Sequence, residues 1–120
     1  MKPKIYGIKN CNTMKKTFQL FEKENTGYEF IDYKKQAPNE SLLRKFINQL
    51  GLDIVINKKG MTYRKLEEED KKATGFIDTA IPVLIEKSSM IKRPIIEFGD
   101  GGNVAGLDEE KLIMRIKENA

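Results

Sequence analysis

Apolar positions change from strand spacing to helix spacing and back within the first 33 residues of the chain. A short apolar run over residues 5–8 predicts a strand, and apolar residues at helical spacing from Met14 onward predict a helix over 13–25. The aromatic run over 28–33 predicts a second strand. A strand, a helix and a strand in this order form a βαβ unit with parallel pairing and a right-handed crossover.

The middle of the chain has the pattern of several helices. Asn39 is the expected N-cap of a helix that ends at Gly51, and another helix is predicted over 77–87. In this second helix we expect Pro82 to lie in the first turn, because a proline further along removes a backbone hydrogen bond. We therefore expect a helical insertion over about 39–88.

The last part of the chain predicts a hairpin and a closing helix. A strand that opens on Pro94 is expected in the stretch 90–98, and the turn at Asp100-Gly101-Gly102 returns the chain into a strand over 103–105. Asp108 is the expected cap of the final helix. The whole order indicates one α/β domain over residues 1–120, with a thioredoxin-like mixed sheet (βαβ, then ββα) and a helical insertion.

The only cysteine, Cys11, falls between the first strand and the first helix. The positive end of a helix dipole stabilises a thiolate, and nearby cations lower a thiol pKa further from about 8.5. Lys9, Lys15 and Lys16 supply such cations. An inert, buried cysteine is the alternative, but the polar neighbours on both sides favour a reactive thiol in a loop. The expected N-cap of this helix is Asn12 or the residue after it.

Composition excludes most other ways of activating this thiol. The chain has no histidine, so a Cys-His pair, a histidine base and an ordinary zinc site are all excluded, and we expect no metal. A second thiol must come from another molecule. The net charge of +4 is spread among acidic residues, and no apolar run approaches the roughly 20 residues that span a bilayer. We expect a cytoplasmic monomer that binds neither nucleic acid nor membrane.

Three motifs resemble those of a known family. They are, in chain order, Tyr6-Gly-Ile-Lys-Asn-Cys11, Asn57-Lys-Lys-Gly-Met-Thr-Tyr-Arg-Lys-Leu66 and Ile91-Lys-Arg-Pro94. Together they resemble the arsenate reductase (ArsC) family, and most closely its YffB-like branch. The resemblance implies a thioredoxin-like fold with a helical subdomain, a nucleophilic Cys11, an Arg93 that faces the cysteine, and a cis peptide bond before Pro94.

The first functional hypothesis is a glutathione-dependent thiol reductase that acts on a small oxidised substrate or a protein disulfide. Backbone N–H groups of residues 12–14 would stabilise the thiolate, with Asn10, Asn12 and Thr13 as candidate side-chain donors. The residues expected to bind glutathione or substrate are Lys9, Asn57, Lys59, Arg93 and Pro94. Glutathione would act as a co-substrate, and no bound cofactor is expected.

Two alternatives stay open. An arsenate reductase would use the same nucleophile with glutathione and glutaredoxin. True arsenate reductases resemble one another in using two further arginines to hold the oxyanion, whereas this chain has Asn57 at the first of these places and no arginine over 103–107, where the last would fall. A transcriptional adaptor of Spx type would instead bind RNA polymerase through the helical region and need no turnover.

Overall fold

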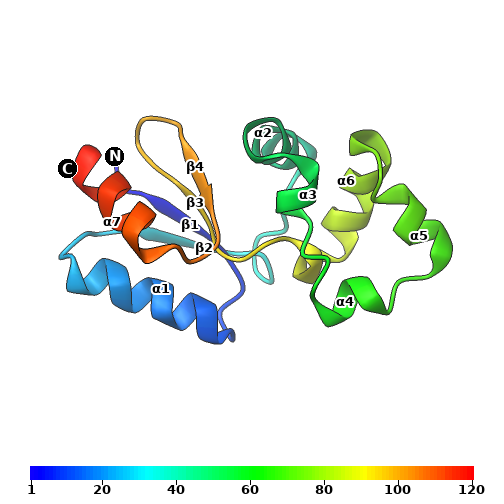
Figure 1. Cartoon of the computed structure of the whole chain (residues 1–120), viewed down its shortest axis with the longest axis horizontal. Helices are drawn as coiled ribbons and strands as arrows, with labels where there is room; N and C mark the ends of the chain where they lie inside the picture. Colours follow the sequence, from blue (N-terminus) through cyan, green and yellow to red (C-terminus); the bar gives the residue numbers. More distant parts are fainter. The chain divides into compact units, whose positions relative to one another are not determined.

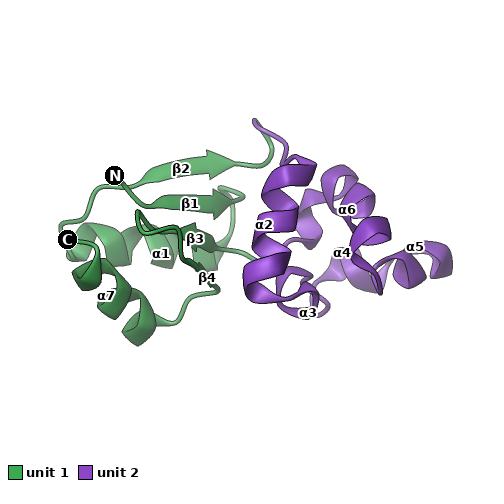
Figure 2. Cartoon of the chain, turned by 90° about the horizontal axis from the view of Figure 1, so that it is seen from above, with its two compact units in different colours: residues 1–35, 93–120 green, residues 36–92 purple.

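The computed structural model describes residues 1–120, which form two compact units (Figures 1 and 2). Unit 1 contains Met1–Lys35 and Arg93–Ala120, drawn in green in Figure 2. Unit 2 contains Gln36–Lys92, drawn in purple. The helical insertion expected at about 39–88 lies within unit 2.

Unit 1 is a mixed four-stranded sheet with two helices. Its elements are β1 (Lys4–Gly7), α1 (Asn12–Lys23), β2 (Glu29–Asp32), β3 (Ile95–Glu97), β4 (Asn103–Ala105) and α7 (Glu109–Glu118). The strand order is β2-β1-β3-β4, with β1 and β2 parallel and the other two pairs antiparallel. This topology confirms the predicted thioredoxin-like sheet, with the parallel pair joined through α1.

The core of unit 1 forms where one face of the sheet meets the two helices. Ile5, Ile96 and Val104 lie opposite one another on neighbouring strands, so their side chains point to the same face. They pack with apolar residues that recur at helical spacing on α1 and α7. The buried partners from these helices are Met14, Leu20, Phe21, Leu112 and Ile116. Packing of α1 on this face fixes the position of its N-terminus after β1.

Unit 2 consists of short helices around its own apolar residues. Its elements are α2 (Glu40–Leu50), α3 (Leu52–Val55), α4 (Met61–Arg64), α5 (Glu68–Ala73), α6 (Ile77–Glu86) and the 3₁₀ helix η1 (Ser88–Met90). Asn39 caps α2 as predicted, since its side-chain oxygen accepts the Leu42 N–H at 2.8 Å. The pattern of helix α2 buries Leu43, Phe46 and Ile47. No helix of the chain is both long enough and apolar enough to cross a bilayer.

One local prediction is wrong, and a second is confirmed only in part. Pro82 lies inside α6 and not in its first turn. The carbonyl that loses its partner there is that of Asp78, and both residues are exposed, so water can hydrogen-bond to this carbonyl. The strand expected in the stretch 90–98 opens directly after Pro94 as predicted, but it is limited to Ile95–Glu97. Met90 instead ends η1, and Ile91 makes only an isolated bridge with Ile56.

A guanidinium at the end of α7 holds the β3–β4 hairpin. Arg115 donates to Asp100 at 2.8 Å and to Glu118 at 2.7 Å, and it lies 5.0 Å from the centre of the Phe98 ring. Asp100 also accepts the Gly102 N–H at 2.9 Å. The Arg115 hydrogen bond, followed by the Gly102 amide, lowers the pKa of Asp100 from 3.8 to about 2.

This lowered pKa predicts a loss of stability in acid. A carboxylate with a lower pKa in the folded state stabilises that state above its unfolded pKa, and the contribution is lost as the pH falls from about 4 to about 2. We expect Asp100→Asn to be less stable than the parent at pH 7 and to differ little from it near pH 2. Urea unfolding at both pH values measures this. A matched control is Glu69→Gln, at an exposed carboxylate without an ion pair; an equal pH effect there would contradict the assignment.

Candidate active site

Cys11 is the N-cap residue of α1. Its backbone is extended (φ −149°, ψ 130°), and its carbonyl accepts the Lys15 N–H at 3.0 Å, which is the first hydrogen bond of the helix. The prediction of Asn12 or Thr13 as the cap is wrong because the chain turns helical directly after the cysteine. The side chain that faces the free amides of the first turn is therefore the sulfur itself.

The surroundings of this sulfur favour its ionised form. Burial of the thiol is the largest single influence and raises its pKa, but hydrogen bonds from the Met14 and Thr13 amides and from the Arg93 guanidinium oppose it. Together with the positive charge of Arg93 they lower the pKa of Cys11. The amides of the first turn thus act on the thiolate, which is the nucleophilic form.

The first turn of α1 is anchored beneath the cysteine. Met14 is fully buried, and its side chain lies directly against Gly7 at the end of β1. A Cβ on Gly7 would come within 2.7 Å of the sulfur and the methyl group of Met14. Cys11 itself is half-buried and packs against the core of unit 1. The amides that face the sulfur are therefore held in place by packing.

Sheet topology brings Arg93 to the cysteine although the two are far apart in the chain. Tyr6 pairs with Ile95 in antiparallel strands, so the end of β1 lies beside the start of β3. The Arg93–Pro94 peptide bond is cis, as the family resemblance implied. Pro94 is buried, and its carbonyl accepts the Gly106 N–H at 2.7 Å. Arg93 therefore begins from a fixed backbone position next to the turn that carries Cys11.

The other predicted site residues are not all brought to the sulfur. The side chains of Asn10, Asn12 and Thr13 make no hydrogen bond to it; Thr13 contributes only its backbone amide. The backbone amide of Met14 also acts on the sulfur, and it lies within the range 12–14 that was expected to supply backbone donors. The charge that acts on the thiol is that of Arg93, and not that of the exposed Lys9.

Asn57 and Lys59 belong to unit 2, in the loop between α3 and α4. With Lys58 and Lys92 they line a hollow of about 230 Å³ in that unit. Lys58 is paired there with Asp53 at 3.0 Å. A role of Asn57 and Lys59 in binding substrate stays a prediction.

Removal of the guanidinium should raise the pKa of Cys11. We expect Arg93→Met to lower the rate of alkylation by iodoacetamide severalfold at pH 7, because a smaller fraction of the thiol is ionised, while Arg93→Lys keeps part of the effect. The rate measured as a function of pH separates a change in pKa from a change in access. Lys15→Met is the matched control on α1, and an equal effect of both substitutions would contradict a specific role of Arg93.

Solved structures of related proteins share this fold. The YFFB (PA3664) protein is 34% identical, with a TM-score of 0.90 over 96% of this chain and 99% of that protein. An arsenate reductase (ArsC) related protein from Brucella melitensis is 33% identical, with a TM-score of 0.75 over 98% of this chain and 96% of that protein.

Sequence comparison agrees with these structures. An uncharacterised protein of Haemophilus influenzae is 36% identical over 107 residues, which cover 89% of this chain and 92% of that protein. Residues 6–114 match the ArsC family as a whole, and this confirms the resemblance seen in the three motifs. The chain therefore belongs to the ArsC family, which supports a thiol-based reductase at the level of the family.

Proposed function

We propose that this chain is a thiol reductase with Cys11 as its only nucleophile and glutathione as its electron donor. The observation that carries the proposal is the position of a half-buried sulfur at the N-terminus of α1, where it faces the Met14 and Thr13 amides and the Arg93 guanidinium. These groups lower the pKa of the thiol. A thiolate attacks disulfides, and a thiol with a lowered pKa is also a good leaving group. Both steps of a thiol exchange benefit from the same environment.

The proposed reaction is a pair of thiol–disulfide exchanges. The Cys11 thiolate attacks one sulfur of a disulfide R–S–S–R′, an S–S bond forms between Cys11 and R, and R′–S⁻ leaves and takes a proton from solvent. The thiolate of glutathione then attacks the sulfur of R, forms a disulfide with it, and releases Cys11 as the thiolate. A second glutathione repeats the exchange on that disulfide. Two glutathione molecules supply the two electrons, and Cys11 returns to its starting form.

The remaining predicted residues take their roles within this proposal. Arg93 would attract an anionic group of the substrate as well as stabilise the thiolate, since a guanidinium binds carboxylates in a bidentate manner. Lys9, Asn57 and Lys59 would add polar contacts to glutathione or to the oxidised substrate, and Pro94 would border the site. The substrate is a small oxidised compound or a protein disulfide, and glutaredoxin is a candidate partner.

Mass spectrometry after incubation with oxidised glutathione tests this proposal. We expect one glutathione per chain, attached at Cys11, and formed faster than on an unstructured peptide thiol at the same pH. A large excess of reduced glutathione should remove it and restore the free thiol. Formation no faster than on the peptide would speak against an activated Cys11, and an adduct that resists reduced glutathione would speak against turnover.

Arsenate reduction is a second candidate, favoured by the 33% identity to the arsenate reductase related protein of Brucella melitensis. It would use the same thiolate and form an arsenate ester on Cys11. Lysine near Asn57 would have to hold the oxyanion, and lysine lacks the bidentate fork of arginine. Arsenate-dependent oxidation of glutathione in the presence of glutaredoxin tests it, and turnover no higher than with Cys11→Ser would exclude it.

A further inference from the structure

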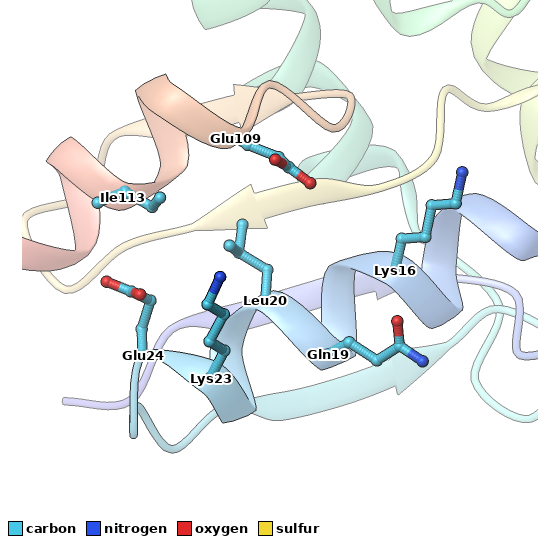
Figure 3. Close-up of a pocket in the computed structure, with 7 residues that line it drawn as sticks. All are labelled: Lys16, Gln19, Leu20, Lys23, Glu24, Glu109 and Ile113. Atoms are coloured by element: carbon cyan, nitrogen blue, oxygen red, sulfur yellow. The ribbon is translucent and has the colours of Figure 1, made fainter.

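A hollow of about 410 Å³ lies between α1 and α7, within unit 1 (Figure 3). Its volume is in the range of about 300–1,000 Å³ typical of small-molecule sites. Leu20 and Ile113 supply apolar surface, and Figure 3 shows Leu20 between the two helices. Lys16 lies toward one end of the hollow, and Lys23 and Glu24 lie toward the other.

Charged side chains of both signs line this hollow without pairing. Lys16 and Lys23 come from α1, Glu24 follows that helix, and Glu109 comes from the first turn of α7. None of these four side chains makes an ion pair or a hydrogen bond. Gln19, also on α1, adds an amide to the lining. Such a set offers donors and acceptors to a ligand that itself carries both an ammonium and a carboxylate.

The hollow begins close to the nucleophile along the same helix. Lys16 follows Cys11 by five residues, or roughly 7.5 Å along a helix axis. Cys11 and Ile113 pack against the same apolar core, so the sulfur and the hollow lie on the same side of the sheet. In glutathione the glutamyl head is separated from the thiol by about two residues of extended chain, or roughly 7 Å. The distance from Cys11 to Lys16 along the helix therefore agrees with the distance from the thiol to the glutamyl head in glutathione.

We propose that the hollow binds the glutamyl head of glutathione and directs the thiol of the bound molecule toward Cys11. The carboxylate of the head interacts with Lys16, at the end of the hollow nearer Cys11, and its ammonium interacts with Glu109. Lys23 and Glu24 border the far end of the hollow. The identity of the ligand rests on the proposed function, whereas the binding itself requires no reaction at Cys11. Lys16 and Glu109 thus select glutathione over thiols without a glutamyl head.

Binding of an unreactive analogue tests this inference directly. S-methylglutathione is titrated into the full-length Cys11→Ser protein and followed by backbone amide NMR. We expect shifts at residues 16–24 and 109–113 that saturate in the millimolar range. In Lys16→Gln/Lys23→Gln the Kd should rise about tenfold. The matched control is Lys34→Gln/Lys65→Gln, which removes the same charge from two exposed positions outside the hollow and should leave the Kd unchanged.

A second ligand tests whether the glutamyl head is the group that binds in the hollow. S-methyl-cysteinylglycine lacks the glutamyl residue, and we expect it to bind the parent protein about tenfold more weakly than S-methylglutathione. This difference should shrink in Glu109→Gln and in the double lysine variant. Equal binding of both ligands, equal weakening by the control variant, or shifts confined to the Cys11 loop and Arg93 would overturn the inference.

Failure of this inference can be told apart from failure of the proposed function. The wild-type protein is also reacted with hydroxyethyl disulfide, which has no glutamyl head. Rapid reaction of Cys11 with this disulfide, together with no amide shifts at 16–24 on titration of S-methylglutathione, would overturn the binding site and leave the thiol reductase intact. Saturable binding of S-methylglutathione with an unreactive Cys11 would support the site and contradict the reductase.

Discussion

Cys11→Ser is expected to lower glutathione-dependent disulfide reduction by about 10³-fold or more, because the chain holds no other thiol to replace the nucleophile. The measurement is the rate of disulfide reduction in an assay that recycles oxidised glutathione. Reduction that continues at the wild-type rate would contradict a covalent role of Cys11.

Folding should not be lost in this variant. Serine is among the best N-cap residues, and its oxygen can accept the Met14 or Thr13 amide that the sulfur faces in the parent protein. We expect the urea midpoint of Cys11→Ser to equal or slightly exceed that of the parent. A variant that loses both activity and stability would point to a structural role of the cysteine.

Phe21→Ala should cost about 3–5 kcal/mol of unfolding free energy, which is the usual effect of removing a large aromatic side chain from a core. Phe21 is 0% exposed on the inner face of α1 and meets the Tyr28 ring edge-on at a centroid distance of 5.7 Å. Its removal leaves a cavity in the core that positions the start of α1. Urea unfolding at pH 7 measures the loss.

Met114→Ala is the matched control, since this large apolar residue on α7 is 62% exposed. It should change the unfolding free energy by less than about 0.5 kcal/mol. If the two substitutions destabilise equally, or if Phe21→Ala unfolds like the parent, then the packing of α1 described here is wrong.

Helical periodicity and turn residues predicted most of the fold. The spacing of Met14, Phe18 and Phe21 predicted α1 and its inner face, and Asn39 and Asp108 were identified as caps that the structure confirms. These signals are local, since they depend on residues within a few positions of one another. They could therefore be found without knowledge of the tertiary structure.

The parts that could not be predicted depend on contacts between distant segments, or on neighbouring residues with similar preferences for the same position. Asn12 and Thr13 are better capping residues than cysteine, so local preference predicted the wrong N-cap. Arg93 reaches Cys11 through the pairing of β1 with β3, whereas the local sequence around Cys11 indicated only the nearby lysines as sources of charge. The position of Arg93 and the cis bond before Pro94 came from the family resemblance alone.

The central claim is that the Met14 and Thr13 amides and the Arg93 guanidinium lower the pKa of the Cys11 thiol and so favour its thiolate. The most direct measurement is the pH dependence of iodoacetamide alkylation, with the carbon-13 chemical shift of Cys11 Cβ as an independent record of ionisation. The structure predicts a pKa below that of an ordinary thiol, because the Met14 and Thr13 amides and Arg93 outweigh the effect of burial. A midpoint at or above about 8.5 in both measurements would contradict this claim.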